Sequence, residues 1–244
     1  YSQPVCALAV CISYLYPTGV TAGALALAWF FYTALLAALG LVRVAVERMF
    51  ASDQLALNAG LLYSIIGGGW LVLSRLGATP MDFGHLITLL TSVHFHYAGF
   101  AALVFVGLTG RRLTRAVPSL RPIYDLLVYG TILSISLLAV GITLSPLIEV
   151  ISAFILAACL TVLALMTFII VVRRVRKKSA RTLLAIASVS LVVGMVFALL
   201  YAVSQYSESY VISILRMAHY HGWANSLLFS VCGLWAWNLA ESVE

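Results

Sequence analysis

The sequence predicts an all-α integral membrane protein, a bundle of about eight transmembrane helices in which seven are complete and the first is partial. Two observations carry this prediction. Of the 244 residues, 63% are hydrophobic and only 9% are charged, whereas a soluble domain carries roughly 25% charged residues. The hydrophobic residues also form runs long enough to cross a bilayer, which takes about 20 apolar residues in a helix. A chain of this composition could not cover a surface that faces water.

Eight apolar runs follow one another along the chain. The first run, at about residues 4–16, ends at Pro17 and is shorter than a full span, so we count it as partial. The other seven lie at residues 19–42, 54–76, 83–109, 122–144, 147–172, 182–203 and 212–239. These runs are too long and too continuously apolar for barrel strands, which are about ten residues long and alternate in polarity. We find no linker, no further domain and no convincing internal repeat, so residues 1–244 form a single transmembrane helical domain.

The basic residues mark the joints between the runs and predict the orientation. Twelve of the 14 basic residues fall in three joints, at residues 43–53, 110–121 and 173–181. These joints lie on one side of the membrane if the N-terminus is cytoplasmic, and the positive-inside rule then places both termini in the cytoplasm. Because the positive charge is confined to the joints, the net charge of +6 is no sign of nucleic-acid binding.

Polar residues interrupt the fourth run on one face. Ionisable groups within a span are costly and face protein or a water-filled cavity. Four polar residues of this run share one helical face at offsets of 3, 7 and 11 residues from the first: His85, Thr88, Ser92 and His96. His94 points elsewhere, because two residues turn a helix through about 200°. We therefore expect this helix to be surrounded by protein.

Two further segments place polar groups at a similar depth. In the last run, His219 and His221 diverge in direction, whereas His221 and Asn225 are four residues apart and share a face. In the sixth run, Ser145 is expected to cap a helix whose first residue is Pro146, which brings Glu149 into the outer half of the membrane. Any one intramembrane histidine often does no more than hydrogen-bond two helices together, and that explanation stays open for each of these.

The residue types favour acid–base chemistry without a metal or cofactor. His96, His221 and Glu149 could supply three metal ligands, but the chain has no H-E-x-x-H string and an H-x-H pair on a helix does not chelate. A carboxyl group in an apolar site stays protonated and can act as an acid, while a nearby histidine accepts a proton and aromatic faces stabilise a cation. The candidate catalytic residues are Glu149, His94, His96 and His221, and the candidate substrate-binding residues are Asp82, His85, Asn225, His219, Trp70, Phe95, Tyr97 and Trp223.

Three strings resemble a known family: GGGWLVLSRLG at 67–77, LLTSVHFHYAGFAALVFVGLTGR at 89–111, and HGWANSLLFSVCGLWAW at 221–237. They are similar to the YndJ-like bacterial membrane proteins, although "FS" at 229–230 replaces the glycine-phenylalanine pattern typical of that family after Asn225. The resemblance implies a multi-pass protein of the bacterial cytoplasmic membrane. In size and habit the chain also resembles the integral-membrane terpene cyclases of bacterial meroterpenoid pathways.

Two functions stay open at this point. The first is an enzyme that cyclises a membrane-dissolved prenyl compound, in which Glu149 protonates an alkene or epoxide and histidines orient it or accept the final proton. Its partners are a hydrophobic prenyl-type small molecule and membrane lipid. The alternative is a proton-coupled transporter or permease that uses the same glutamate and histidines. A dead-end apolar pocket open to lipid favours the enzyme, and polar vestibules favour transport.

Overall fold

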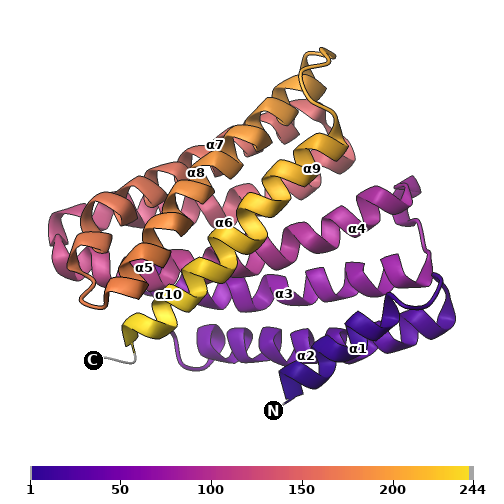
Figure 1. Cartoon of the computed structure of the whole chain (residues 1–244), viewed down its shortest axis with the longest axis horizontal. Helices are drawn as coiled ribbons and strands as arrows, with labels where there is room; N and C mark the ends of the chain where they lie inside the picture. Colours follow the sequence, from indigo (N-terminus) through magenta and orange to yellow (C-terminus); the bar gives the residue numbers. More distant parts are fainter. Residues whose placement is uncertain (1, 242–244) are drawn as a thin grey trace. The chain divides into compact units, whose positions relative to one another are not determined.

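The fold is entirely helical over residues 2–241, the part of the chain that the computed structural model describes (Figure 1). Eight helical rods follow one another there, as the sequence predicts. The rods are α1 (Ser2–Ser13); α2 (Val20–Ala45); α3 (Ser52–Leu76); α4 (His85–His94) with η2 (Phe95–Ala102) and α5 (Leu103–Ala116); η3 (Pro118–Leu120) with α6 (Arg121–Leu144); α7 (Pro146–Met166) with η4 (Thr167–Val171) and η5 (Val172–Arg174); α8 (Lys178–Tyr206); and α9 (Ile214–Trp223) with η6 (Ala224–Val231) and α10 (Cys232–Glu241).

Six of the described rods are long and apolar enough to cross a membrane: Val20–Ala45, Ser52–Leu76, His85–Ala116, Pro118–Leu144, Pro146–Arg174 and Lys178–Tyr206. The first rod, Ser2–Ser13, is apolar but shorter, in agreement with the predicted partial helix. The last rod is not among the six, and it carries His219, His221 and Asn225. The predicted class, a multi-pass helical membrane protein, is confirmed.

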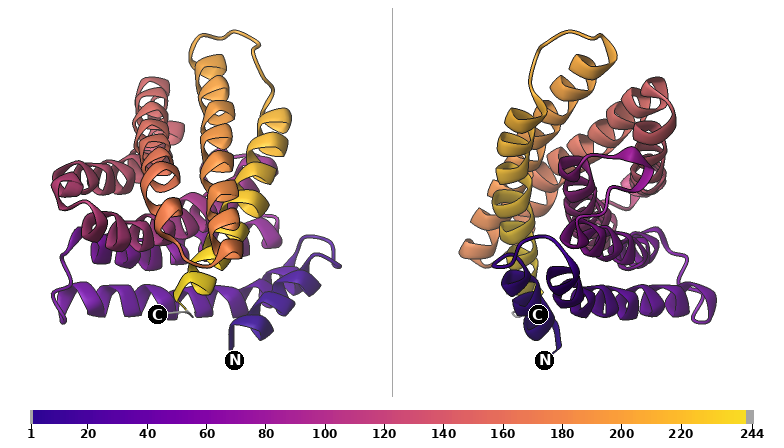
Figure 2. Two further views of the ribbon diagram at one scale, coloured as in Figure 1. Left: turned by 60° about the vertical axis from the view of Figure 1, so that its left-hand side comes forward. Right: turned by 90° about the vertical axis from the view of Figure 1, so that its right-hand side faces the viewer.

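The chain divides into two compact units, Tyr1–Leu103 and Val104–Glu244, which we call unit 1 and unit 2. Unit 1 contains α1 to α4 and η2, and unit 2 contains α6 to α10 and nearly all of α5. Within unit 2, α8 lies alongside the rod formed by α9, η6 and α10 (Figure 2). In both units, therefore, the rod that carries histidines packs against the rod that precedes it.

A buried arginine fastens α1 within unit 1. The side chain of Arg75, at the end of α3, is 8% exposed and donates from Nη2 to the carbonyl oxygens of Ser13 and Tyr16, each at 2.8 Å. Its guanidinium group also lies 4.4 Å from the centre of the Tyr14 ring. The last carbonyl groups of a helix have no partner within the helix, and a cation beside them is favourable. Arg75, which lies outside the basic joints, thus hydrogen-bonds to carbonyl groups at and just after the C-terminal end of α1.

Three helical segments depart from the α-helical pitch. The segments η2, η4 and η6 are π-helical, and η2 and η6 both span eight residues directly after a ten-residue α-helix. π-helical turns are rare and occur frequently at functional sites. The segment η2 begins within the H-x-H string at 94–96, and η6 begins three residues after the one at 219–221, which directs attention to these two rods.

Candidate functional site

His96 projects from η2, and both of its ring nitrogens are engaged. Trp29 Nε1 donates to His96 Nε2 at 2.7 Å, and His96 Nδ1 lies 2.8 Å from the carbonyl oxygen of Ser92. An indole N–H can only donate and a carbonyl oxygen can only accept. The ring is therefore the neutral tautomer with its proton on Nδ1. Both ring nitrogens are thus engaged in hydrogen bonds, and the bond from Trp29 joins α2 to η2.

A glycine of α3 makes room for this arrangement. Ser92 Oγ donates to the carbonyl oxygen of Gly67 at 2.9 Å. A Cβ atom added to Gly67 would come within 2.8 Å of His96 Nδ1 and 2.9 Å of Cε1, so no larger residue fits without displacing the ring. Ser92 and His96 thus form an i, i+4 pair in which both side chains contact the backbone of Gly67.

Unit 2 holds a second polar pair, formed by His221 and Asn225. His221 Nδ1 lies 2.8 Å from the carbonyl oxygen of Gly194 on α8, and Asn225 Nδ2 donates to the carbonyl oxygen of His221 at 3.0 Å. Because Gly194 can only accept, His221 carries its proton on Nδ1, and the approach of Asn225 Nδ2 to that atom at 3.1 Å joins two donors. Asn225 is 7% exposed, and its Oδ1 has no hydrogen-bond partner among the described residues. His221 Nε2 likewise has no hydrogen-bond partner within the described part of the chain.

The two clusters have the same construction. In each, the first residue of an i, i+4 pair bonds to the carbonyl oxygen of a glycine on the preceding rod. The second residue then bonds back to the carbonyl oxygen of the first and lies against the α-carbon of that glycine. Gly67, Ser92 and His96 in unit 1 correspond in this way to Gly194, His221 and Asn225 in unit 2.

The surrounding rods follow the same correspondence. The first residues of α2 and α7 are 126 residues apart, those of α3 and α8 also 126, and those of α4 and α9 129. The π-helical segments η2 and η6 both begin and end 129 residues apart. The chain therefore contains two tandem sets of four rods. The sequence itself shows no convincing repeat, and the correspondence lies in the bounds of the helices and in one glycine of each unit.

Glu149 lies near the start of α7, as the sequence predicts, and bonds to neither His219 nor His221 among the described residues. Ser145 is the N-cap of α7, its Oγ accepts from the backbone of Ile148 at 3.5 Å, and Pro146 is the first helical residue. The Glu149 side chain is half-buried and makes no hydrogen bond or ion pair with His219 or His221 among the described residues.

The other candidates of unit 1 are spread over its surface and core. Thr88 and Ser92 are buried at 0% and 2% exposure, whereas His85 is exposed, because it is the first residue of α4. The prediction that this polar face is buried is thus confirmed for Thr88 and Ser92 and wrong for His85, the first residue of α4. Asp82 is exposed in η1 (Pro80–Asp82). Tyr97 is half-buried in η2.

The remaining candidate residues contact aromatic rings. Phe95 is 4% exposed and lies edge-on both to Tyr63, at 5.9 Å between ring centres, and to His94, at 5.7 Å. Trp70 stacks on Phe83 at 6.0 Å. In unit 2, His219 and Trp223 are both exposed, and their rings lie 6.4 Å apart. No group of three or more histidine, cysteine, aspartate or glutamate side chains that could hold a metal occurs among the described residues.

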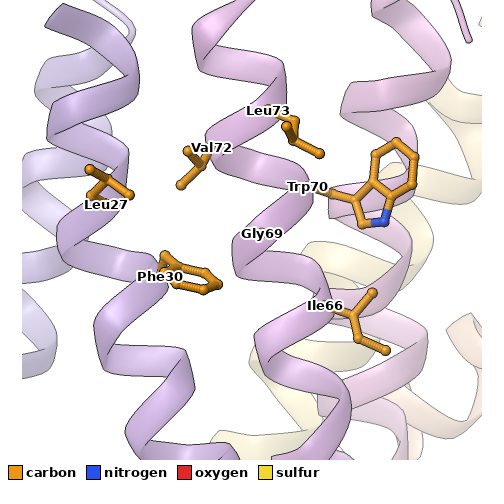
Figure 3. A pocket seen from close by; sticks show the side chains of 7 residues that line it. All are labelled: Leu27, Phe30, Ile66, Gly69, Trp70, Val72 and Leu73. Carbon is orange, nitrogen blue, oxygen red and sulfur yellow. The ribbon is translucent and has the colours of Figure 1, made fainter. Parts of the chain in front are cut away.

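An open apolar groove runs between α2 and α3 (Figure 3). It is lined by Leu27, Phe30, Ile66, Gly69, Trp70, Val72 and Leu73. Phe30 points from α2 toward Gly69, and a Cβ added to Gly69 would lie 3.8 Å from Cε2 of its ring, an ordinary contact distance. The lining contains no ionisable group, so the groove offers no acid or base of its own.

Sequence reasoning missed two residues that complete these clusters. Trp29 supplies the donor to His96, and Gly194 supplies the acceptor to His221. A glycine within an apolar run is a usable signal of close helix contact in membranes. A tryptophan or tyrosine in such a run carries no signal of its own, because most of them only pack.

The fold and its intramembrane polar pairs define the class: a multi-pass, all-helical membrane protein. The chain belongs to the YndJ-like family, whose model matches residues 1–229, and the resemblance seen in the sequence is confirmed. It is 29% identical over 220 residues to a protein of Bacillus subtilis (strain 168) described as "Uncharacterized membrane protein YndJ". That match covers 90% of this chain and 39% of the relative, so the chain spans less than half of the relative's length. No solved structure matches the chain.

Proposed function

We propose that the chain is the membrane-embedded part of a proton-coupled permease for a small polar solute. The observation that carries the proposal is the tandem repeat with one glycine-backed polar pair in each unit. Many transporters are built from internal repeats and bind their substrates near the midplane at irregular helical segments. Each set has four rods, which follow one another in the same order along the chain. That arrangement is typical of parallel-repeat transporters.

The orientation proposed for this permease follows from the basic joints. With both termini in the cytoplasm of a bacterium, Glu149 and the turn between α8 and α9 lie on the outer side of the cytoplasmic membrane. Glu149 is then the first ionisable group of α7 that a solute or proton meets from outside. His221, whose Nδ1–H is fixed by a carbonyl oxygen, offers Nε2 as the proton acceptor further in.

The test is proton flux in reconstituted vesicles. Purified protein is inserted into liposomes that hold a pH-sensitive dye, and amino acids, organic acids, amines and sugars are added outside in turn. Wild type should acidify the lumen with at least one solute, and Glu149→Gln and His221→Gln should abolish the response. His219→Gln is the matched control, because His219 is exposed and lies two residues away; it should keep the flux. Absence of flux across the panel would overturn the proposal.

A second candidate is metal-independent, acid-initiated cyclisation of a prenyl compound. The apolar groove between α2 and α3 supports it, since an isoprenoid chain could enter such a groove from the lipid. An acid would protonate the alkene or epoxide and a base would remove the final proton, so the product is a cyclic isomer of unchanged mass. Detergent-solubilised protein incubated with a prenyl panel tests this directly. Conversion without added metal or nucleotide, together with no flux in vesicles, favours the enzyme over the permease.

A further inference from the structure

One end of unit 2 carries a dense group of positive charges. Its joints at residues 110–121 and 173–181 contain four and six basic residues and no acidic residue. The joint of unit 1 at residues 43–53 contains two residues of each sign, so the excess is confined to unit 2. The positive-inside rule concerns the bias of basic residues between the two sides of the membrane and does not require that they gather on one surface. Orientation alone therefore does not account for this density.

The packing of α6 against α7 brings the two joints together. A Cβ atom added to Gly141 would meet the backbone of Glu149, and one added to Gly130 would lie 2.7 Å from Cys159 Sγ, so the two helices are antiparallel. Continuing this register past Gly130 sets the turn before α6 beside η5. The joint at 110–121 and the start of the joint at 173–181 are thus neighbours.

The last rod meets the same end of unit 2. Arg112 Nη2 donates to the carbonyl oxygen of Ala240 at 3.5 Å, which places the end of α5 beside the end of α10. The helix α10 packs against α8, where Gly233 lies against Ala187, and the two run in opposite directions. The end of α10 therefore also lies beside the start of α8, so both joints border one surface.

Most of these cations have no anionic partner within the protein. Arg121 pairs with Asp125 at 3.1 Å, and Arg181 donates from Nε and Nη2 to the carbonyl oxygen of Val175, at 3.1 and 2.9 Å. Six further side chains form no hydrogen bond or ion pair with any described residue, and we call them the basic surface: Arg115, Arg173, Arg174, Arg176, Lys177 and Lys178. All of them except Lys177, which is half-buried, are exposed.

The joint at 173–181 holds these charges in place although they repel one another. Val175 is 2% exposed and accepts both bonds from Arg181, whereas the residues on either side of it point outward. The first turn of α8 contains Lys178 and Arg181 and no acidic residue. Cations at the start of a helix are unfavourable because the helix dipole is positive there. The charges thus stabilise neither α8 nor each other, and an anion from outside the protein would offset both costs.

The basic surface lies where lipid phosphates are. Arg115 is in the last turn of the span His85–Ala116, Arg173 and Arg174 end the span Pro146–Arg174, and Lys178 begins the span Lys178–Tyr206. The ends of spans lie at the level of the headgroups, and long basic side chains extend to that level. Lipid phosphates therefore reach these side chains more readily than a soluble macromolecule does.

We propose that the basic surface binds the headgroups of anionic phospholipids. Guanidinium groups donate in pairs to phosphate oxygens, and ammonium groups add positive charge beside them. A phospholipid with a net negative headgroup is attracted, whereas the cation of a zwitterionic headgroup opposes its own phosphate. The proposal is independent of the permease function, because it concerns the lipid around unit 2 and no transported solute.

Binding is measured by native mass spectrometry of the purified protein in detergent micelles. The protein is titrated with phosphatidylglycerol or with phosphatidylcholine of the same acyl chains. Phosphatidylglycerol should bind about tenfold more tightly or better, and its binding should weaken as the ionic strength rises. Equal binding of the two lipids would overturn the proposal. Displacement of phosphatidylglycerol by excess inorganic phosphate would also overturn it, because the ligand would then be the free anion.

Three variants assign the binding to the basic surface. Arg176→Gln alone should weaken phosphatidylglycerol binding about fivefold, and Arg173→Gln, Arg174→Gln and Arg176→Gln together about tenfold or more. Lysine at the same three positions keeps the charge and should retain most of the binding, which separates charge from folding. Arg216→Gln is the matched control, because Arg216 is exposed but lies on α9 at the other end of α8; it should bind like wild type. Equal losses in Arg176→Gln and Arg216→Gln, or failure of the lysine variant to bind, would refute the assignment.

Discussion

The hydrogen bond from Trp29 to His96 tests the unit 1 cluster most directly. Trp29→Phe deletes the indole N–H, keeps an aromatic ring and leaves His96 Nε2 facing hydrocarbon. A buried acceptor left without a donor costs about 1–3 kcal/mol in soluble proteins. Interhelical hydrogen bonds in membranes average about 0.6 kcal/mol, with a maximum near 1.7. The 2.7 Å distance and the fixed tautomer place this bond at the strong end, so we expect a loss of about 1–2 kcal/mol.

The free energy of unfolding is measured by titrating mixed micelles with a denaturing detergent. Trp235→Phe is the matched control, because Trp235 is 60% exposed and the same substitution there should change stability by less than about 0.5 kcal/mol. A double-mutant cycle with His96→Leu should return a coupling of about 1 kcal/mol between the two positions. Equal effects of the two tryptophan substitutions, or zero coupling, would refute the account of His96 as an interhelical anchor.

Three further predictions follow from the structure. Gly194→Ala should lower the free energy of unfolding by about 1–3 kcal/mol, because the new Cβ meets the Asn225 amide, whereas Gly222→Ala, with open space around it, should leave stability unchanged or raise it by up to about 1 kcal/mol. Asn58→Leu should raise stability by about 1 kcal/mol, since both amide atoms of Asn58 are buried without partners among the described residues; a loss would contradict this. After replacement of the native cysteines, a cysteine at Ser179 should be labelled from the cytoplasm and one at Ser207 from outside, and the reverse pattern would contradict the orientation.

The rods could be predicted from the sequence because the bilayer dictates them. Every backbone group in hydrocarbon must be paired within its own segment, so an apolar run of sufficient length is a helix. The run predicted at 19–42 is α2 from Val20 to Ala45, and the capping signals at Ser145 and Pro146 begin α7 where expected. Such features depend only on neighbours along the chain.

The hydrogen bonds of the candidate site join residues on different rods, and the sequence alone does not show which residues meet. Helical phase correctly placed Thr88, Ser92 and His96 on one face, yet it does not identify Trp29 as the group that meets His96. Phase also assumes a uniform 3.6-residue period, and η2 departs from it directly after His94. At the exposed start of α4 the same periodicity fails for His85, because no rod covers that turn.

The H-x-H strings show how a motif can mislead about a repeat. Aligned as text, HFH at 94–96 and HYH at 219–221 pair His96 with His221 across 125 residues. The hydrogen bonds pair Ser92 with His221 and His96 with Asn225 across 129 residues, one helical turn further along. The histidine thus bonds to the glycine carbonyl in unit 2 and lies against the α-carbon of the glycine in unit 1. Because Trp29 supplies a donor to His96 Nε2 and His221 Nε2 has no hydrogen-bond partner among the described residues, the same residue type is satisfied differently in the two units.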